Sequence, residues 1–226
     1  MKLQSKRFSE KGHNDFTTKN FMLDLLISQP AAFVLIFGGL IVAIGIHEAA
    51  HAFMADYLGD PTPRSLGRTS LNPLVHLDPL GTVVILVTGV FGWGKPAPYD
   101  PFNLRHPRQD TALIALAGPA SNIVLAIILS AVLHFVSFPA IVYTILIRLI
   151  IINVSLSVFN LMPVPPLDGS KIIGLFMSNE SALRFQNQNG LMLLVLILLP
   201  IFGGYSIASI VISPIATAIL RILLPS

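Results

Sequence analysis

The feature that most constrains this chain is an H-E-x-x-H motif, His47-Glu48-Ala49-Ala50-His51, inside a long apolar run. Residues four apart lie on one face of an α-helix, so His47 and His51 can bind one metal ion together. Glu48 projects beside that ion, where it can hold a water molecule. An ionisable side chain near the bilayer centre costs roughly 3 kcal/mol unless it has a partner. The motif therefore predicts a metal site, and the alternative is a buried polar contact between helices.

The composition is that of an integral membrane protein. Hydrophobic residues make up 54% of the chain and charged residues 11%, whereas soluble domains carry about 25% charged residues. The chain has no cysteine, so a metal here must be bound by histidine and carboxylate groups. No basic patch is interleaved with aromatic residues, so nucleic acid is not an expected partner. Residues 1–20 form a polar tail without the apolar core of a signal peptide.

Hydropathy predicts an all-α polytopic membrane protein with about four to five transmembrane helices. The expected spans are residues 31–58, 111–136, 140–161 and 191–212, the last interrupted by Pro200 and Gly203-Gly204. Residues 20–28 are too short to span and are expected on the membrane surface. The remaining segments are expected to be a short helix at 170–178, a polar connection at 179–189, and an interfacial helix or a tail of the last span at 214–224.

Residues 80–94 are apolar but too few to span a membrane as a helix. Their β-branched residues and bracketing glycines predict a short re-entrant β-hairpin. Such a hairpin survives at membrane depth only where protein or a wet cavity covers it. A short buried helix remains the alternative.

The third expected span runs into Asn160-Leu161-Met162-Pro163-Val164-Pro165-Pro166-Leu167-Asp168-Gly169, where three prolines exclude continued helix. Unwound backbone is common at functional sites in membranes. By itself Asp168 would be a loop residue or a helix cap. Because two histidines in an open zinc site need a third ligand, Asp168 is predicted to supply it. Asn122, within the second expected span, could equally form an interhelical hydrogen bond at a packing notch.

Three motifs together resemble the site-2 proteases, a family of intramembrane zinc metalloproteases. The H-E-x-x-H motif is the first, Gly118-Pro119-Ala120-Ser121-Asn122 matches G-P-x-x-N, and the segment ending in Asp168-Gly169 fits N-x-x-P-x-P-x-L-D-G at every fixed position. Asn72-Pro73 through His76 and Asp78-Pro79 are also similar to compact prokaryotic members that lack a PDZ or other appended domain. The resemblance covers about residues 31–169.

The resemblance implies one zinc ion per chain, bound by His47, His51 and Asp168, with Glu48 as the catalytic acid/base. It also implies polar roles for Asn122 and Asn160 near the scissile peptide, where they would hold the substrate or the developing oxyanion. No other cofactor is expected.

The expected reaction is hydrolysis of peptide bonds within or near transmembrane helices of other proteins, as in regulated intramembrane proteolysis. The strand-like run at 82–88 is expected to align the unwound substrate beside the metal. The alternative function is a non-proteolytic membrane metal-binding protein or a divalent-ion carrier. Carriers are often built from repeated halves, and no halves are detected in this sequence.

The chain is expected to form one membrane domain over residues 1–226, with a core at 31–178, an N-terminal tail at 1–20 and C-terminal helices at 190–224. Its expected partners are a transmembrane protein substrate and the bilayer, and the sequence leaves the oligomeric state open. The distribution of basic residues between loops leaves the orientation nearly undecided. The resemblance implies a multi-pass protein of the cell membrane with its active site nearer the cytoplasmic face.

Overall fold

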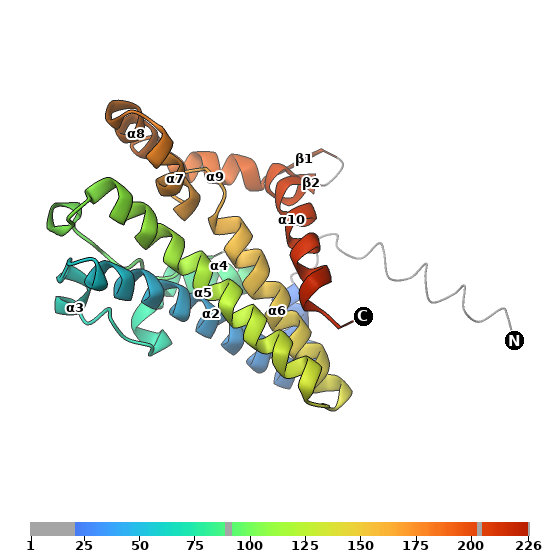
Figure 1. The fold of residues 1–226 in the computed structure, drawn as a ribbon. Coiled ribbons are helices and arrows are strands. Elements are labelled where there is room, and N and C mark those ends of the chain that lie inside the picture. Colours follow the sequence, from blue (N-terminus) through green and yellow to red (C-terminus); the bar gives the residue numbers. More distant parts are fainter. Residues whose placement is uncertain (1–20, 89–91, 203–204, 226) are drawn as a thin grey trace, which may run out of the picture.

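The computed structural model describes residues 21–88, 92–202 and 205–225, so the predicted N-terminal tail lies outside the described residues. Helices dominate this part of the chain (Figure 1). In order, with η for a 3₁₀ helix, the elements are α1 (Phe21–Ser28), α2 (Pro30–Tyr57), α3 (Thr62–Ser65), η1 (Pro73–His76), α4 (Pro79–Thr88), η2 (Pro101–Asn103), α5 (Pro107–Phe135), α6 (Ala140–Asn160), α7 (Asp168–Ile173), η3 (Gly174–Phe176), α8 (Asn179–Gln186), α9 (Gly190–Leu198), β1 (Pro200–Phe202), β2 (Tyr205–Ser206) and α10 (Ile207–Leu223).

Three helices of the described chain, α2, α5 and α6, are long and apolar enough to cross a membrane. They confirm the spans predicted at 31–58, 111–136 and 140–161, although α5 begins four residues earlier, at Pro107. In Figure 1 the three helices run alongside one another, and α5 packs against both α2 and α6. The structure is therefore a helical membrane protein, as the composition predicts.

Close helix approach explains how an apolar bundle holds together in lipid, where burial of apolar side chains gives little drive for association. A methyl group at Gly39 of α2 would lie 2.2 Å from Leu149 Cδ2 of α6, so these helices meet where a side chain is missing. The last helix, α10, packs against α6. The buried members of the cluster shared by α5, α6 and α10 are Ala126, Leu133, Ile150, Val154, Val158 and Ala216.

The predicted β-hairpin at 80–94 is wrong for the residues described there, because Pro79–Thr88 forms the helix α4. Residues 89–91 lie outside the described chain. The helix start is encoded locally: the Asp78 carboxylate accepts the Gly81 N–H at 2.7 Å, and Pro79 occupies the first position. These start signals outweigh the β-branched content of the run, and the short-helix alternative is the correct one.

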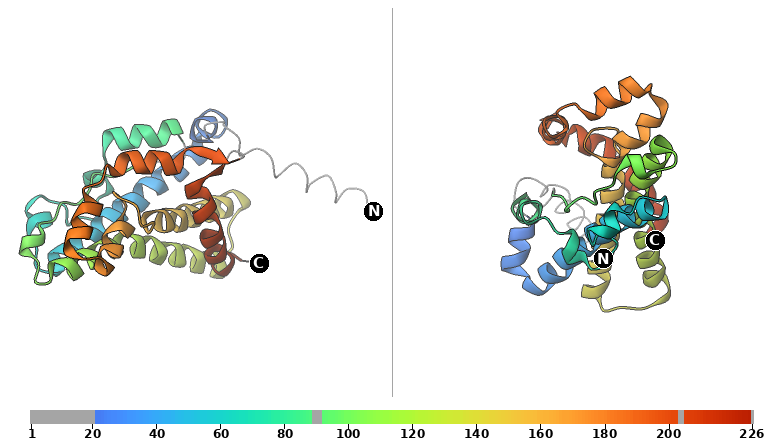
Figure 2. Two further views of the ribbon diagram at one scale, coloured as in Figure 1. Left: turned by 90° about the horizontal axis from the view of Figure 1, so that it is seen from above. Right: turned by 90° about the vertical axis from the view of Figure 1, so that its left-hand side faces the viewer.

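The predicted fourth span, residues 191–212, is not one continuous helix. The helix α9 ends at Leu198, before Pro200, and β1 then pairs antiparallel with β2. The predicted interruption is thus confirmed at Pro200, while Gly203-Gly204 lies outside the described residues. Figure 2 shows α4 and α9 on the side of the molecule opposite α5. The predicted total of four to five spans is not confirmed.

Two further boundaries differ from the prediction. Residues 214–224 were expected to be an interfacial helix or the tail of the last span. The helix α10 runs continuously from Ile207 to Leu223 through Pro214, so these residues continue a helix that begins within the expected span. Its start is capped by Ser206, whose hydroxyl accepts the Ser209 N–H at 3.0 Å. The expected polar connection at 179–189 contains the helix α8, which is capped in the same way by Ser178.

Asp60 ties together the polar loops at the C-terminal end of α2. Its buried carboxylate accepts hydrogen bonds from the Thr62 hydroxyl at 2.6 Å, the Asn103 amide at 2.8 Å and the Asp100 N–H at 2.7 Å. Burial alone would raise the pKa of Asp60, but these hydrogen bonds outweigh it and hold the pKa below its ordinary value. The ionised carboxylate thus fixes η2 beside α2 and directs the chain into α5.

Asp60→Ala should lower the thermal unfolding midpoint of the protein in detergent, because it removes the acceptor of several partly buried donors, each hydrogen bond contributing about 0.5–1.5 kcal/mol. A lowered folded-state pKa means that the contribution is fully present above the ordinary pKa of about 4 and is lost as the pH falls through the folded-state value. The difference in midpoint between wild type and variant should therefore shrink below pH about 4. Arg64→Ala, which removes an exposed ion pair with Asp56, is the control and should change little. Equal shifts for both variants would contradict this role for Asp60.

Candidate metal centre

The three predicted ligands meet at one point. His47 and His51 project from α2, and Asp168 is the first residue of α7. Asp168 Oδ2 lies 3.2 Å from Nε2 of each histidine, and the two Nε2 atoms are 3.1 Å apart. All three residues are buried, and among the described residues they are the one group found with the composition and spacing to hold a metal ion.

The hydrogen bonds on the far side of each imidazole fix its tautomer. His47 Nδ1 lies 2.7 Å from Asn122 Oδ1, and His51 Nδ1 lies 2.6 Å from the Ile114 carbonyl oxygen. Because both partners are acceptors, each Nδ1 carries the hydrogen and donates it. When the ring is neutral, this tautomer presents the lone pair of Nε2 to the shared point, as metal-binding histidines do. Three lone-pair atoms this close repel one another unless a cation lies between them.

A zinc ion fits this donor set. Ligand atoms at about 2.0–2.1 Å from a tetrahedral zinc lie roughly 3.3 Å from one another, and the separations here are 3.1 to 3.2 Å. Two imidazole nitrogens and one carboxylate oxygen leave the fourth position open, which is the arrangement of catalytic zinc sites. The structure thus brings His47, His51 and Asp168 together with zinc-like spacing where the sequence predicts a metal site.

Asn122 lies behind His47 and does not line the cavity described below. Its side chain is fully buried, and Nδ2 donates to the Ala43 carbonyl at 3.2 Å and to Asn153 Oδ1 at 3.0 Å. Both amide hydrogens are therefore used, and Oδ1 is left to accept from His47. This arrangement does not support the expected contact with substrate or oxyanion. It matches the interhelical hydrogen bond that the sequence left open.

Asn153 is a site residue that sequence reasoning missed. It is buried in the middle of α6, where Nδ2 donates to the Leu149 carbonyl at 2.9 Å and Oδ1 accepts from Asn122. This bond selects which end of the Asn122 amide faces His47. The signal was present in the sequence, because an amide inside an apolar span is costly unless it has a partner.

A cavity of about 510 Å³ opens onto the three ligands. Glu48 and Asn160 lie on its wall, both half-buried, and Asn160 Nδ2 donates to the Leu156 carbonyl at 2.9 Å. Most of the remaining lining is apolar, including Ile44, Leu156, Phe159, Leu167 and Leu194. The predicted acid/base thus faces the same space as the metal ligands, and Asn160 stays available to a bound molecule.

Residues 94–97 lie along the cavity beside Glu48, and Gly94, Pro96 and Ala97 are part of its lining. The Ala97 N–H donates to Glu48 Oε2 at 3.2 Å. Gly94 packs so tightly on α2 that a methyl group there would lie 3.1 Å from Glu48 Cγ. The segment is anchored on its other side by an antiparallel bridge between Gly94 and Leu77 and by the Lys95 N–H, which donates to the His76 carbonyl at 2.7 Å.

Arg108, near the start of α5, holds the element that carries Asp168. Its guanidinium donates to the carbonyl oxygens of Gly174, Leu175 and Met177 and to the Asn179 side chain. These groups follow α7 directly, so one side chain gathers the carbonyl groups at the end of the ligand-bearing helix. This role depends on tertiary contacts that the sequence alone does not show.

Fold and site together define a helical membrane protein with a His-His-Asp metal centre and an acid beside it, the arrangement of a membrane metallopeptidase. The chain matches Peptidase family M50 over residues 33–145 and 139–202, and it belongs to this family, that of the site-2 proteases. By family the chain is therefore a zinc-dependent protease. No solved structure is significantly similar to it.

Curated relatives agree with this membership. Three of them are named "Putative zinc metalloprotease": YwhC from Bacillus subtilis, Rip2 from Mycolicibacterium smegmatis and MJ0611 from Methanocaldococcus jannaschii. The chain is 42% identical to YwhC over 59% of its own length and 65% of the relative's. It is 30% identical to Rip2 over 76% and 70% of the two chains, and 29% identical to MJ0611 over 74% and 85%.

Gly118→Ala should abolish metal binding. Gly118 lies where α5 passes the two imidazoles, and a methyl group there would lie 2.4 Å from His51 Nε2 and 2.7 Å from His47 Cε1. The rings would have to turn away from their shared point. Zinc content of the purified variant, measured by plasma mass spectrometry, should fall from one ion per chain to below about a tenth. Gly38→Ala in α2, where nothing lies within 4 Å of an added methyl group, is the matched control and should keep its zinc. Full zinc occupancy in Gly118→Ala would contradict the geometry.

Proposed function

We propose that the chain is a zinc-dependent intramembrane endopeptidase that hydrolyses peptide bonds in or near transmembrane helices of other membrane proteins. The observation that carries the proposal is Glu48, which faces the same apolar cavity as the three convergent ligands. A divalent-ion carrier has no use for an additional carboxylate that is poised beside the ligands and held by the Ala97 N–H.

Zinc, Glu48, Asn160 and Asn122 have different parts in the proposed reaction. Bound zinc supplies Lewis-acid chemistry, lowering the pKa of water and polarising a carbonyl group. Glu48 takes the proton of the attacking water and passes it to the leaving nitrogen. Asn160 lies on the wall of the cavity, where its amide can hold the substrate backbone. Asn122, with both amide hydrogens already used, keeps His47 in the ligating tautomer.

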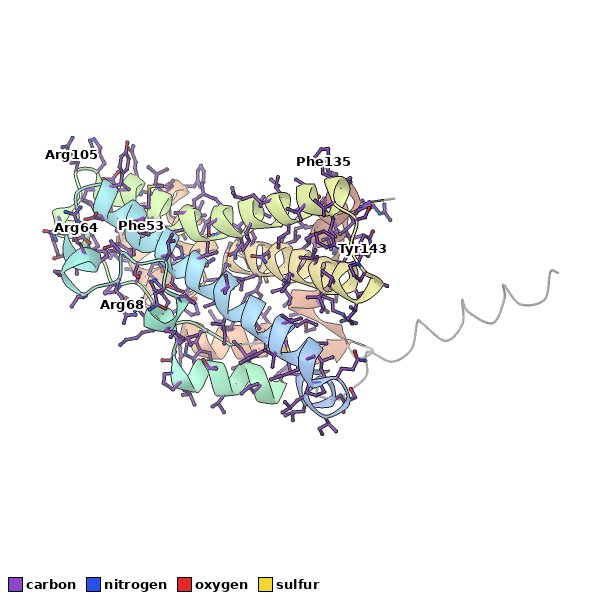
Figure 3. All side chains as sticks on the ribbon, turned by 90° about the horizontal axis from the view of Figure 1, so that it is seen from below. Phe53, Arg64, Arg68, Arg105, Phe135 and Tyr143 are labelled. Carbon is purple, nitrogen blue, oxygen red and sulfur yellow. The ribbon has the colours of Figure 1, made fainter. Side chains whose placement is uncertain are left out.

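The site lies within the membrane but closer to one surface. His47 is ten residues before Tyr57, the last residue of α2, which corresponds to roughly 15 Å along the helix. Figure 3 shows Arg64, Arg68 and Arg105 gathered at this end, with Phe135 and Tyr143 at the opposite end. Basic residues favour the cytoplasmic side. The basic residues of the N-terminal tail weigh the other way, so the charges alone do not decide the orientation. Because the family resemblance implies it, we place the chain in the cell membrane with the site nearer the cytoplasm.

A transmembrane substrate must unwind before its carbonyl groups become accessible, and the freed backbone groups then need partners. The predicted partner at 82–88 is excluded because those residues are helical. The extended residues 94–97 replace it in the proposal. Since the Lys95 N–H points toward His76, the alternation of an extended chain turns the carbonyl groups of Gly94 and Pro96 to the opposite edge. Gly94 and Pro96 line the cavity and Lys95 does not, so this edge can pair with the substrate.

Glu48→Gln should retain zinc and lose peptide hydrolysis. Glutamine keeps the size of the side chain but cannot take a proton, so kcat for cleavage of a transmembrane peptide should fall at least about 10²–10⁴-fold. Zinc content and cleavage are measured on the same preparation. Zinc lost in proportion to activity would instead make Glu48 a ligand and contradict the assignment.

Lys95→Pro should weaken substrate alignment without touching the metal ligands. Proline removes the N–H that binds the His76 carbonyl, so the segment loses a backbone anchor. Zinc content should hold, while cleavage of a helical substrate should fall about tenfold and that of a substrate with Gly or Pro near the cut should fall less. Lys95→Ala keeps the N–H and should retain most of the activity. Equal activity of the Pro and Ala variants on both substrates would remove residues 94–97 from the proposal.

A further inference from the structure

The cavity contains a cation that no step of the reaction described above uses. Lys171 lies on α7, three residues after Asp168, and its half-buried side chain lines the cavity. Among the described residues on that lining it is the one lysine or arginine. A cation in an apolar cavity within the membrane is costly, and such residues commonly have a function.

The ammonium group lies close to the metal position. Lys171 Nζ is 3.7 Å from Asp168 Oδ1, while the other carboxylate oxygen, Oδ2, faces the two histidines. A separation of 3.7 Å is longer than a hydrogen bond, so Asp168 does not consume the N–H donors of the ammonium. Nζ also lies 5.7 Å from the centre of the Tyr99 ring, whose face attracts a cation. Tyr99 and Asp168 thus restrain the ammonium from two sides while its donors remain available.

Peptide hydrolysis creates a need for such a donor. When water adds to the carbonyl carbon, Glu48 takes one proton and the electron pair of the C=O bond moves onto the oxygen. Breaking of the C–N bond then returns that electron pair, and Glu48 delivers its proton to the leaving nitrogen. Between these two events the oxygen is negatively charged, and preorganised donors stabilise it by far more than they stabilise the starting peptide. Asn122, which was expected to serve here, has no amide hydrogen left.

We propose that Lys171 is the residue that donates a hydrogen bond to this developing oxyanion, acting from the α7 part of the cavity lining, while Glu48 acts from α2. The ammonium contributes charge and a hydrogen bond, and Glu48 carries out the proton transfer. Its four-carbon stem is flexible, so Nζ can leave the neighbourhood of Asp168 Oδ1 as the carbonyl oxygen becomes negative. The inference rests on the proposed peptidase function and adds a catalytic residue to it.

The test compares Lys171→Met with wild type in three measurements: zinc per chain, kcat and KM for a transmembrane peptide, and the dissociation constant of a phosphinic peptide. A phosphinic peptide carries a tetrahedral anion in place of the scissile amide and is not cleaved, so its binding reports on oxyanion stabilisation without turnover. Lys171→Met should keep its zinc and change KM less than about threefold. Its kcat should fall about 10²-fold, and its dissociation constant for the phosphinic peptide should rise by a similar factor.

Two further variants complete the test. Lys171→Arg keeps a cation and should retain kcat within about tenfold of wild type. Arg184→Met removes a basic residue from an exposed ion pair with Glu180 on α8 and should behave as wild type.

If Lys171→Met loses zinc and excess zinc restores its kcat, Lys171 serves only as a partner of Asp168 and the inference is overturned. An unchanged kcat overturns it as well. Wild-type protein that binds zinc but neither cleaves nor binds phosphinic peptide would contradict the peptidase function itself.

Discussion

At the centre of the structure the surrounding helices hold three metal-ligating atoms close together. Two imidazole nitrogens and a carboxylate oxygen lie within 3.2 Å of one another in an otherwise apolar bundle. Bulk lipid offers these atoms no hydrogen-bond partners, so their convergence must be imposed by the surrounding helices. A bound zinc ion would replace the repulsion among these three atoms with attraction and would thereby stabilise this packing.

Each long helix contributes to this constraint in a different way. The helix α2 carries both histidines, and α5 supplies the Ile114 carbonyl and Asn122 that orient them. The helix α6 adds Asn153, which fixes the Asn122 amide, and Arg108 holds the carbonyl groups that follow α7. Hydrogen bonds link His47, Asn122 and Asn153 in one connected chain, in which both amides have a defined orientation. Such chains limit an apolar bundle to a single register.

The ligand set could be predicted from the sequence because its signals are local and chemically costly. His47, His51 and Asp168 are polar groups in or beside apolar runs, and without cysteine few other ligands were possible. The role of Asn122 could not be predicted, because a motif does not show whether an amide faces the substrate or a ligand. The hairpin prediction failed because composition favoured strand, while a single cap at Asp78 favoured helix. Lys171 and Arg108 escaped notice because the significance of a lone basic residue lies in tertiary contacts.

The most direct test of the account is cleavage of a transmembrane peptide by the purified protein in lipid vesicles. Cleavage should be followed before metal removal, after chelation, and after zinc is returned. The account predicts a cut within the apolar segment that is lost on chelation and restored by one zinc ion per chain. Cleavage that survives complete zinc removal, or a fully zinc-loaded protein that never cuts, would contradict it.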